Sequence, residues 1–426
     1  MTKQTPTCSL LLALGCFLMI PLLQPSDCFG QDRWTRTATD GDELFLGDAT
    51  TITWGFVRDG TGINPAFTGE SSDPSSLISF LDEHVGDNEP GGDDFTNRSW
   101  FPLFNDIFDR WDQVSGLRFV YEPNDNGLDI RGPFNPGELG VVADVRIGGH
   151  SIDGESGRNT LAYNYFPNNG DMVIDTDNIS FYSNGNNNFL GLRNVLAHEF
   201  GHGMGIPHHE SSNSRNLMEP LVDLSFDGAQ IDDIAEAQRR YGDNFEENGG
   251  NDQFINASFL GDFNGDDLAV GVDANMGDSP IEVLPNQTDF VSIDGITDVD
   301  FLEFSVDGLS DLTFTLDMVG PSYQRGPQGG TQTTYDLSSQ SDLDLQILGS
   351  DGVTVLGSSA LDGLNVTEMV QLQLDVGNYF ARISGRDDAI QFYEFRVSGI
   401  AVPEPGALPL AGLALGWLMR RRRVKS

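Results

Sequence analysis

The chain has 426 residues, of which 65 are acidic and 23 basic, giving a formal net charge of −42. A surface of that charge repels nucleic acid and anionic lipid, which excludes both as main partners. It suits calcium binding or simple solubility, and solvated acidic loops are the default explanation for most of the carboxylates. The length is sufficient for two ordinary domains, each with its own core.

Residues 1–30 predict an export signal. Lys3 precedes an apolar run over 10–23, and the segment ends at Gly30 with small residues at alternate positions. This pattern is typical of a secretory signal peptide cut near Gly30, and not of a membrane span. Every cysteine lies in this segment, so the mature chain would hold no disulfide and would depend on its core and on any bound calcium.

Residues 31–243 mix strand and helix patterns, which predicts an α+β domain. Alternation of period two predicts strands at 51–57, 117–121, 128–131, 141–147, 161–166 and 172–176. Apolar residues at three- and four-residue steps predict helices near 75–81, over 103–114 and over 231–241. Trp111 belongs to the apolar stripe of the second helix, so we expect it to pack in the core.

The strongest motif is HEFGHGMGIPH. His198 and His202 are four residues apart, so on a helix they lie one turn apart on one face and can bind one metal ion, with Glu199 beside them. A third ligand must come from beyond the helix, because the next turn would carry it past the ion. Gly205 can adopt the left-handed conformation that ends a helix, which brings His208 back to the ion. Three protein nitrogens and one open position are the pattern of a catalytic zinc.

The first five residues of the motif, His198 to His202, could by themselves occur by chance on an ordinary helix. The added glycine and third histidine at fixed spacing, with a methionine turn at Met218 downstream, make chance a poor explanation. Asn188 is the expected N-cap of the zinc helix. His209 is expected to be a solvent-exposed neighbour and not a ligand.

Several segments between about 48 and 242 together resemble the metzincin zinc peptidases, and within them the matrixin family. They are the extended histidine motif, the Leu-Met-x-Pro turn at 217–220, the ending Asp-Asp-Ile…Gln-Arg-Arg-Tyr-Gly at 232–242, Trp-Asp-Gln-Val-Ser-Gly at 111–116, and Leu-Ala…Phe-Pro before Gly-Asp at 161–171. The resemblance implies a twisted mixed sheet with three main helices. It also implies that His198, His202 and His208 hold one zinc, that Glu199 is the catalytic base, and that Met218 forms an apolar floor under the ligands.

Two departures from the family pattern matter for metal content. Matrixins commonly hold a second, structural zinc through histidines, whose places here are Tyr163 and Val173. His150 alone cannot form that site, so we predict a single zinc. The resemblance also suggests calcium, whose six to eight oxygen ligands require several carboxylates on adjacent loops. The candidates, against an alternative of ordinary acidic loops, are Asp144, Asp153, Asp171 and Asp175, although Asn178 stands where a glutamate is expected.

The second half predicts a β domain. Residues 244–254 form a polar linker, and residues 255–400 show short alternating runs separated by Gly/Asp turns, which predicts an antiparallel β-sandwich. The stretches at 298–304, 341–345, 377–380 and 393–395 resemble bacterial pre-peptidase C-terminal domains, which are non-catalytic modules of secreted peptidases. An accessory or binding role is therefore expected. Acidic residues at 262–273 mimic a calcium loop, but Asp267 replaces the required glycine, which favours a polar surface loop.

Residues 401–426 predict a sorting or membrane segment. Pro403-Glu404-Pro405 precedes an apolar run over 407–419 and a basic cluster over 420–425. The run is short for a membrane span, and the basic cluster would stay on the cytoplasmic side. The tail resembles the PEP-CTERM sorting signal, which implies an exosortase-type processing enzyme and membrane contact only through this segment. A plain C-terminal anchor is the alternative.

These patterns predict an exported zinc-dependent endopeptidase, located at the cell envelope or outside the cell, that acts on protein or peptide substrates with Glu199 as general base. The alternative is a non-catalytic protein of the cell surface or extracellular matrix with a vestigial protease domain. The intact ligand set argues against decay, because the loss of one histidine would cripple the site. A third reading is that the β domain assists secretion only and is removed on maturation.

Overall fold

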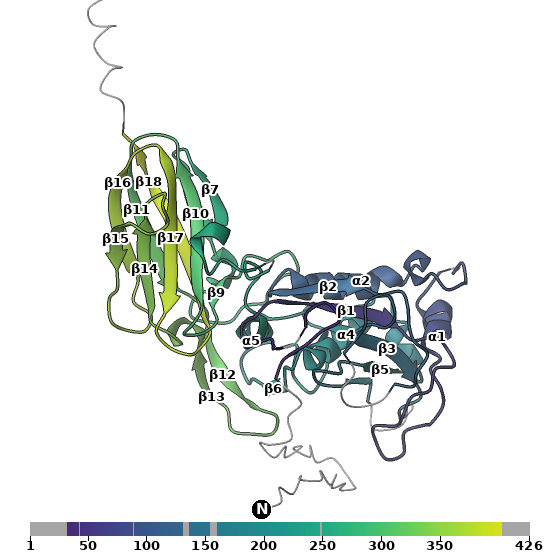
Figure 1. Ribbon diagram of the computed structural model, residues 1–426. Helices are drawn as coiled ribbons and strands as arrows, with labels where there is room; N and C mark the ends of the chain where they lie inside the picture. The colour runs from purple at the N-terminus through teal and green to yellow at the C-terminus, as the bar shows by residue number, and fades with distance from the viewer. Residues whose placement is uncertain are drawn as a thin grey trace, which may run out of the picture.

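The computed structural model describes residues 32–41, 43–87, 89–130, 136–153, 160–247 and 249–402. The predicted signal peptide and the sorting motif from Pro403 onward lie outside the described residues. Within the described residues, no helix combines the length and the apolar character that a membrane crossing requires. The architecture is a mixed α+β region followed by an additional β region, as the sequence predicts (Figure 1).

The first region is built on a mixed five-stranded sheet of order β2-β1-β3-β5-β4. Strands β2, β1, β3 and β5 run parallel, whereas β4 is antiparallel to β5 and forms one edge. The strands are β1 (Thr50–Phe56), β2 (Leu117–Tyr121), β3 (Val145–His150), β4 (Ala162–Asn164) and β5 (Met172–Asp175). The strand predicted at 128–131 is wrong over its described residues: Leu128 is exposed, and Ile130 makes only an isolated bridge to Ile63.

The helices of this region are α1 (Leu77–His84), α2 (Phe101–Asp112), α3 (Ile179–Tyr182), α4 (Leu190–Gly203) and α5 (Ile231–Tyr241). The apolar stripe of α2 is buried, because its side chains pack against β1 on one side and α4 on another. The ring of Phe108 stacks on Trp54 of β1 at 4.4 Å and meets Phe200 of α4 edge-on at 4.7 Å. Trp111 is fully buried in this core, as predicted. The packing thus holds α4 between α2 and the edge of the sheet at β4 and β5.

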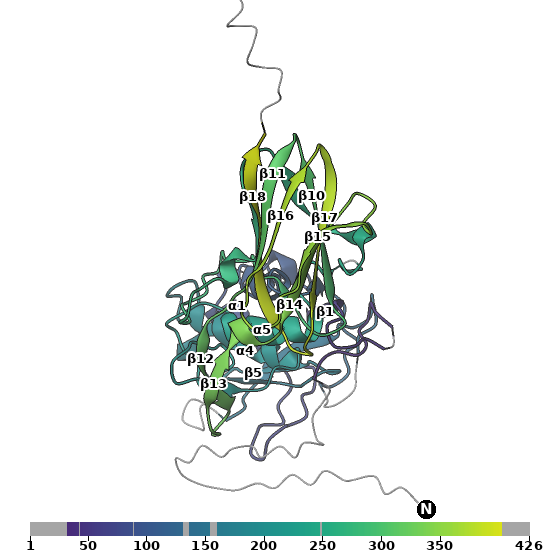
Figure 2. The same ribbon diagram turned by 90° about the vertical axis from the view of Figure 1, so that its left-hand side faces the viewer.

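The second region contains two largely antiparallel sheets, with strand orders β15-β14-β17-β10-β7 and β16-β11-β18-β8 (Figure 2). Buried and partly exposed residues alternate along β10, and one hydrophobic cluster contains the buried side chains of both sheets. The strands are β7 (Ser258–Phe263), β8 (Leu268–Val270), β9 (Ser292–Ile293), β10 (Val299–Val306), β11 (Ser310–Met318), β14 (Leu343–Leu348), β15 (Val355–Ser359), β16 (Glu368–Leu374), β17 (Gly377–Gly385) and β18 (Gln391–Ala401).

The two regions are joined by more than a linker. A hairpin of β12 (Ser322–Pro327) and β13 (Thr333–Asp336) leaves the second region, and β12 pairs with β6 (His209–Glu210) of the first (Figure 1). The core of the first region also continues into the second, because it includes the buried side chains of Ala274, Val283, Phe290, Val319, Tyr323, Leu337, Ile390 and Phe392.

Candidate metal centre

Helix α4 carries the first part of the site and begins without a side-chain cap. The predicted N-cap at Asn188 is wrong: the residue before the helix is Phe189, with φ 56°, and no side chain caps the first turn. Asn187, Asn188 and Phe189 all have positive φ, so the chain enters the helix through a left-handed turn. The helix is held by packing instead, because nearly every residue from Asn194 to Gly203 is buried.

The end of α4 depends on Gly205, whose φ is +100°. The main chain closes there through bonds from Gly205 N to His202 O and from Ile206 N to Gly201 O, both 2.9 Å long. A Cβ at this position would collide with the carbonyl oxygen of Asp32. Only glycine combines this conformation with this contact. The turn directs the following residues back across the face of α4.

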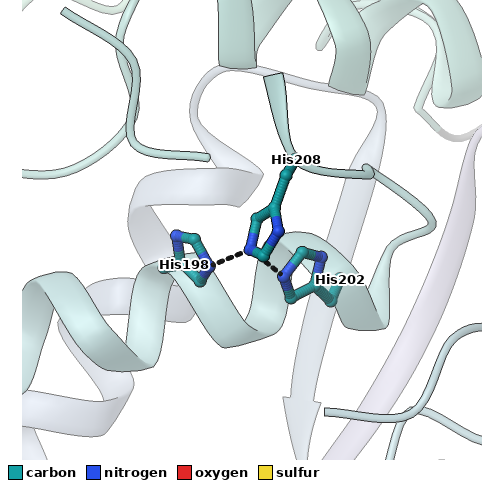
Figure 3. A group of neighbouring side chains, drawn as sticks. All are labelled: His198, His202 and His208. Atoms are coloured by element: carbon teal, nitrogen blue, oxygen red, sulfur yellow. Dashed lines mark hydrogen bonds between the residues drawn. The ribbon is translucent and has the colours of Figure 1, made fainter. Parts of the chain in front are cut away.

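That reversal brings three imidazoles together. His198 and His202 project from one face of α4, and His208 approaches from the segment that follows (Figure 3). The Nε2 atom of His208 lies 3.1 Å from Nε2 of His198 and 3.1 Å from Nε2 of His202. Three nitrogens at about 2.1 Å from one tetrahedral zinc stand about 3.4 Å apart, so the arrangement fits that ion.

The hydrogen bonds made by the three Nδ1 atoms explain why each Nε2 atom can bind a metal ion. Nδ1 of His198 bonds Leu217 O at 2.7 Å, Nδ1 of His202 bonds Ile206 O at 2.8 Å, and Nδ1 of His208 bonds the side-chain oxygen of Gln328 at 2.9 Å. An oxygen of this kind only accepts, so each Nδ1 carries the proton. Three Nε2 lone pairs then face one another, an arrangement that a cation stabilises.

Burial keeps these rings neutral. It lowers the pKa of His198 to about 4, with a further contribution from His208. It also lowers the pKa of His202 well below the ordinary value, with further contributions from His198 and His208. Neutral imidazole is the form that binds a metal ion. The donor set therefore has the right atoms and protonation state at neutral pH.

Glu199 follows the first ligand on α4. Its side chain is 8% exposed, and within the described residues its carboxylate has no hydrogen-bond partner. Burial raises its pKa to about 8. A carboxyl group with that pKa is mostly protonated at neutral pH, so it would accept a proton from a bound molecule only beside a cation that lowers its pKa.

Met218 is fully buried and its side chain packs against α4 at Gly201. A Cβ at Gly201, between the two helical histidines, would collide with its sulfur atom. Asp233 of α5 fixes the turn, because its carboxylate accepts from Leu217 N at 2.7 Å and from Met218 N at 3.0 Å. Met218 thus packs under the ligand-bearing helix.

His209 departs from the expectation of a solvent-exposed neighbour. Its side chain is 16% exposed, with Nδ1 3.7 Å from Asp232 and 3.0 Å from Arg325 of the second region. The expectation is wrong because β12 covers this residue, a contact that no local pattern indicates.

The four aspartates proposed for calcium are distributed around the sheet. Three of their carboxylates accept main-chain N–H groups, from Thr53 of β1, Arg146 of β3 and Ile152, and the fourth accepts from the side chain of Thr160 at 2.9 Å. Within the described residues, the two groups with metal-compatible geometry contain none of them. A calcium role stays a prediction for Asp144, Asp153, Asp171 and Asp175.

The second metal-compatible group was not predicted. It comprises Glu246, Asp298 and Asp300, whose ligand oxygens lie within 4.8 Å of one another at the junction of the two regions. One oxygen of Asp298 and one of Asp300 are buried without a hydrogen-bond partner. Burial raises the pKa of Asp300 to about 7, and burial with repulsion from Asp300 raises that of Glu246 to about 10. Asp298 directly precedes β10 and Asp300 is its second residue, so the pair is close together in the sequence, whereas Glu246 comes from the distant linker.

His150 forms hydrogen bonds and does not belong to the histidine cluster. Its Nε2 lies 2.8 Å from the carboxylate of Glu70, and its Nδ1 lies 2.8 Å from Asp73 O. The hydroxyl of Tyr163 donates to the same carboxylate oxygen at 2.9 Å. Neither metal-compatible group within the described residues includes His150.

Comparison with known proteins shows which family the region around the histidines is similar to. The model of the family described as Matrixin matches residues 91–242, which contain the three histidines and Met218. Residues 91–242 are therefore similar to the matrixin family. The matrixin family is zinc-dependent, which agrees with the ligand geometry.

Two curated proteins are similar to this chain over part of their length. A hatching enzyme of Paracentrotus lividus is 35% identical over 136 residues, which is 32% of this chain and 21% of that protein. Metalloendoproteinase 2-MMP of Arabidopsis thaliana is 30% identical over 155 residues, which is 34% of this chain and 38% of that protein. The chain therefore spans well under half the length of either.

Solved structures give a weaker likeness for the second region. The pre-peptidase C-terminal domain of a Bacillus anthracis collagenase matches at 11% identity with a TM-score of 0.20, over 33% of this chain and 94% of that one. That likeness is too low to carry an argument about this chain.

Proposed function

We propose that the protein is an exported zinc endopeptidase in which His198, His202 and His208 hold the metal. The observation that carries the proposal is the convergence of three Nε2 atoms on one point, with Glu199 buried beside them. Bound there, zinc would lower the pKa of a water molecule towards 7 and polarise the scissile carbonyl.

The side chains of the chain itself perform the remaining tasks. The carboxylate of Glu199 takes the proton of the attacking water and passes it to the leaving amine. The edge strand β4 has one neighbour, β5, so its outer main-chain groups can pair with an extended substrate. Met218 and the turn before it keep the ligand-bearing helix in place from below.

The proposal extends to processing and location. We propose a signal peptide over 1–30, a peptidase domain over 31–243, a linker over 244–254, an accessory β-sandwich over 255–400, and a sorting segment over 401–426 that an exosortase-type enzyme processes. Calcium is proposed as a structural ion. Glu246, Asp298 and Asp300 are now its best-supported ligands, because they combine close geometry with buried oxygens that lack partners.

The test replaces Glu199 with Gln in the full chain. We expect the variant to retain zinc and to lose casein or gelatin hydrolysis by about 10³-fold, the range of a general base. Glu83→Gln, on the exposed side of α1, is the matched control and should digest at the parent rate. A metal chelator should abolish the activity of the parent protein, and added zinc should restore it.

Two results would decide against the proposal. Undiminished proteolysis by Glu199→Gln would remove the assigned base. Absence of proteolysis in the zinc-loaded parent protein would favour the alternative, a non-catalytic surface or matrix protein that binds its partners through the β region.

A further inference from the structure

The third zinc ligand is held by a residue from outside the matrixin domain. The side-chain oxygen of Gln328 accepts the Nδ1 proton of His208 at 2.9 Å, and Gln328 follows β12 in the second region. The corresponding acceptors for His198 and His202 are main-chain carbonyls of the matrixin domain itself, at Leu217 and Ile206.

This contact fixes the chemistry of His208. Because the amide oxygen can only accept, it requires the proton on Nδ1 and leaves the Nε2 lone pair directed at the metal. Without it, the ring could rotate or adopt the other tautomer, in which Nε2 carries the proton and cannot bind. Outer partners of metal-bound histidines typically contribute about 10- to 100-fold in metal affinity.

Several contacts anchor the hairpin to the first region, and together they fix the position of Gln328 beside His208. Main-chain pairing joins Gly326 to Glu210 and Pro327 to His209, next to the ligand. Arg325 forms an ion pair with Asp232 of α5 at 2.9 Å and a second with Glu236.

A hydroxyl from the same hairpin reinforces this anchor. Tyr323 donates its hydroxyl to Asp232 at 2.5 Å, and both side chains are fully buried. Charge-assisted bonds of this kind hold a fixed geometry. The base of the hairpin is therefore bonded to α5 at both Asp232 and Glu236.

We infer that the β12–β13 hairpin is an integral part of the zinc centre and that Gln328 is a positioning residue acting through His208. This inference rests on the proposed zinc function. It assigns the second region a role in building the metal site, beyond that of an attached binding module.

The experiment measures zinc affinity in the full chain by competition with a chromophoric chelator. We expect Gln328→Leu, which removes the acceptor at similar size, to bind zinc 10- to 100-fold more weakly. Gln328→Glu retains an accepting oxygen and should bind within about threefold of the parent protein.

Gln332→Leu is the matched control. Gln332 lies in the same hairpin, and its side-chain oxygen accepts from Ser212 N at 2.8 Å without contacting an imidazole. This variant should retain parent affinity. Circular dichroism of each variant monitors folding.

The outcomes separate the two claims. If the parent protein and His208→Ala bind zinc equally weakly, the proposed function fails. If the parent binds tightly and His208→Ala does not, the proposed function stands, and parent-like affinity in Gln328→Leu overturns the inference. Equal losses in Gln328→Leu and Gln332→Leu also overturn it, because the effect would then belong to the hairpin in general and not to the bond to His208.

Discussion

Replacing Arg325 with Met should weaken the contact between the second region and the first and lower the free energy of unfolding by a measurable amount. The Arg325 side chain is 16% exposed and its partner Asp232 is 1% exposed, so the pair is largely shielded from water. Breaking a buried pair by removing one partner typically costs about 3–5 kcal/mol, because the remaining charge stays buried. Asp232 would keep the hydroxyl of Tyr323, and Glu236 would keep Arg240. The lower end, about 3 kcal/mol, is therefore expected.

Equilibrium urea unfolding followed by tryptophan fluorescence measures this cost. The signal reports on the first core, because the tryptophans of the described residues are buried there. Arg386→Met is the matched control: it removes an arginine with several carboxylate partners on the exposed surface of the second region, where little effect on stability is expected. Equal unfolding curves for the parent protein and Arg325→Met would refute the reasoning.

The same variant should change the response to acid. Burial alone would raise the pKa of Glu236, but Arg240 and Arg325 outweigh it and hold that pKa well below its usual range. A carboxylate with a lowered pKa in the folded state contributes stability above its ordinary pKa of about 4.5, and this contribution is lost as the pH falls towards the folded value. Arg325→Met should therefore lose less stability than the parent protein between about pH 5 and pH 3.

Two further predictions concern a backbone position and the acidic group at the junction. Gly205→Ala should destabilise the protein by more than about 2 kcal/mol in thermal unfolding and weaken zinc binding, because it combines strain with a collision at Asp32 O. Gly60→Ala, at φ +89° in open space, should cost only the strain, about 1 kcal/mol, and equal losses would contradict this account. Millimolar calcium should raise the unfolding temperature of the parent protein, and Asp298→Asn with Asp300→Asn should abolish that rise. A persisting rise would assign calcium to another site.

Sequence patterns predicted those features that depend on local geometry. The helix predicted over 231–241 begins and ends at those residues, because its apolar stripe and the glycine after it mark both limits. Two histidines four residues apart, followed by a glycine and a third histidine, specified the metal cluster for the same reason. Strand alternation predicted a β domain over 255–400, which is where β10, β11, β14, β16, β17 and most of β18 lie.

Features that depend on distant partners were missed. The strand β12 was not predicted, since it pairs with β6 more than a hundred residues earlier, and nothing in its own composition indicates that partner. Gln328 was missed for the same reason. Asn188 has the composition of an N-cap, but a left-handed turn displaces it from that position.

The first described residues limit how far the amino terminus can be trimmed. Trp34 is fully buried, and its indole nitrogen donates to Gly203 O at 2.8 Å, at the last residue of α4. Asp32 O lies against Gly205, where the chain reverses. Loss of Asp32 to Trp34 would leave that helix end with an unpaired carbonyl and an unfilled space behind the three histidines. Under the signal peptide and zinc site proposed above, the accuracy of leader removal would therefore set the fraction of molecules able to hold the metal.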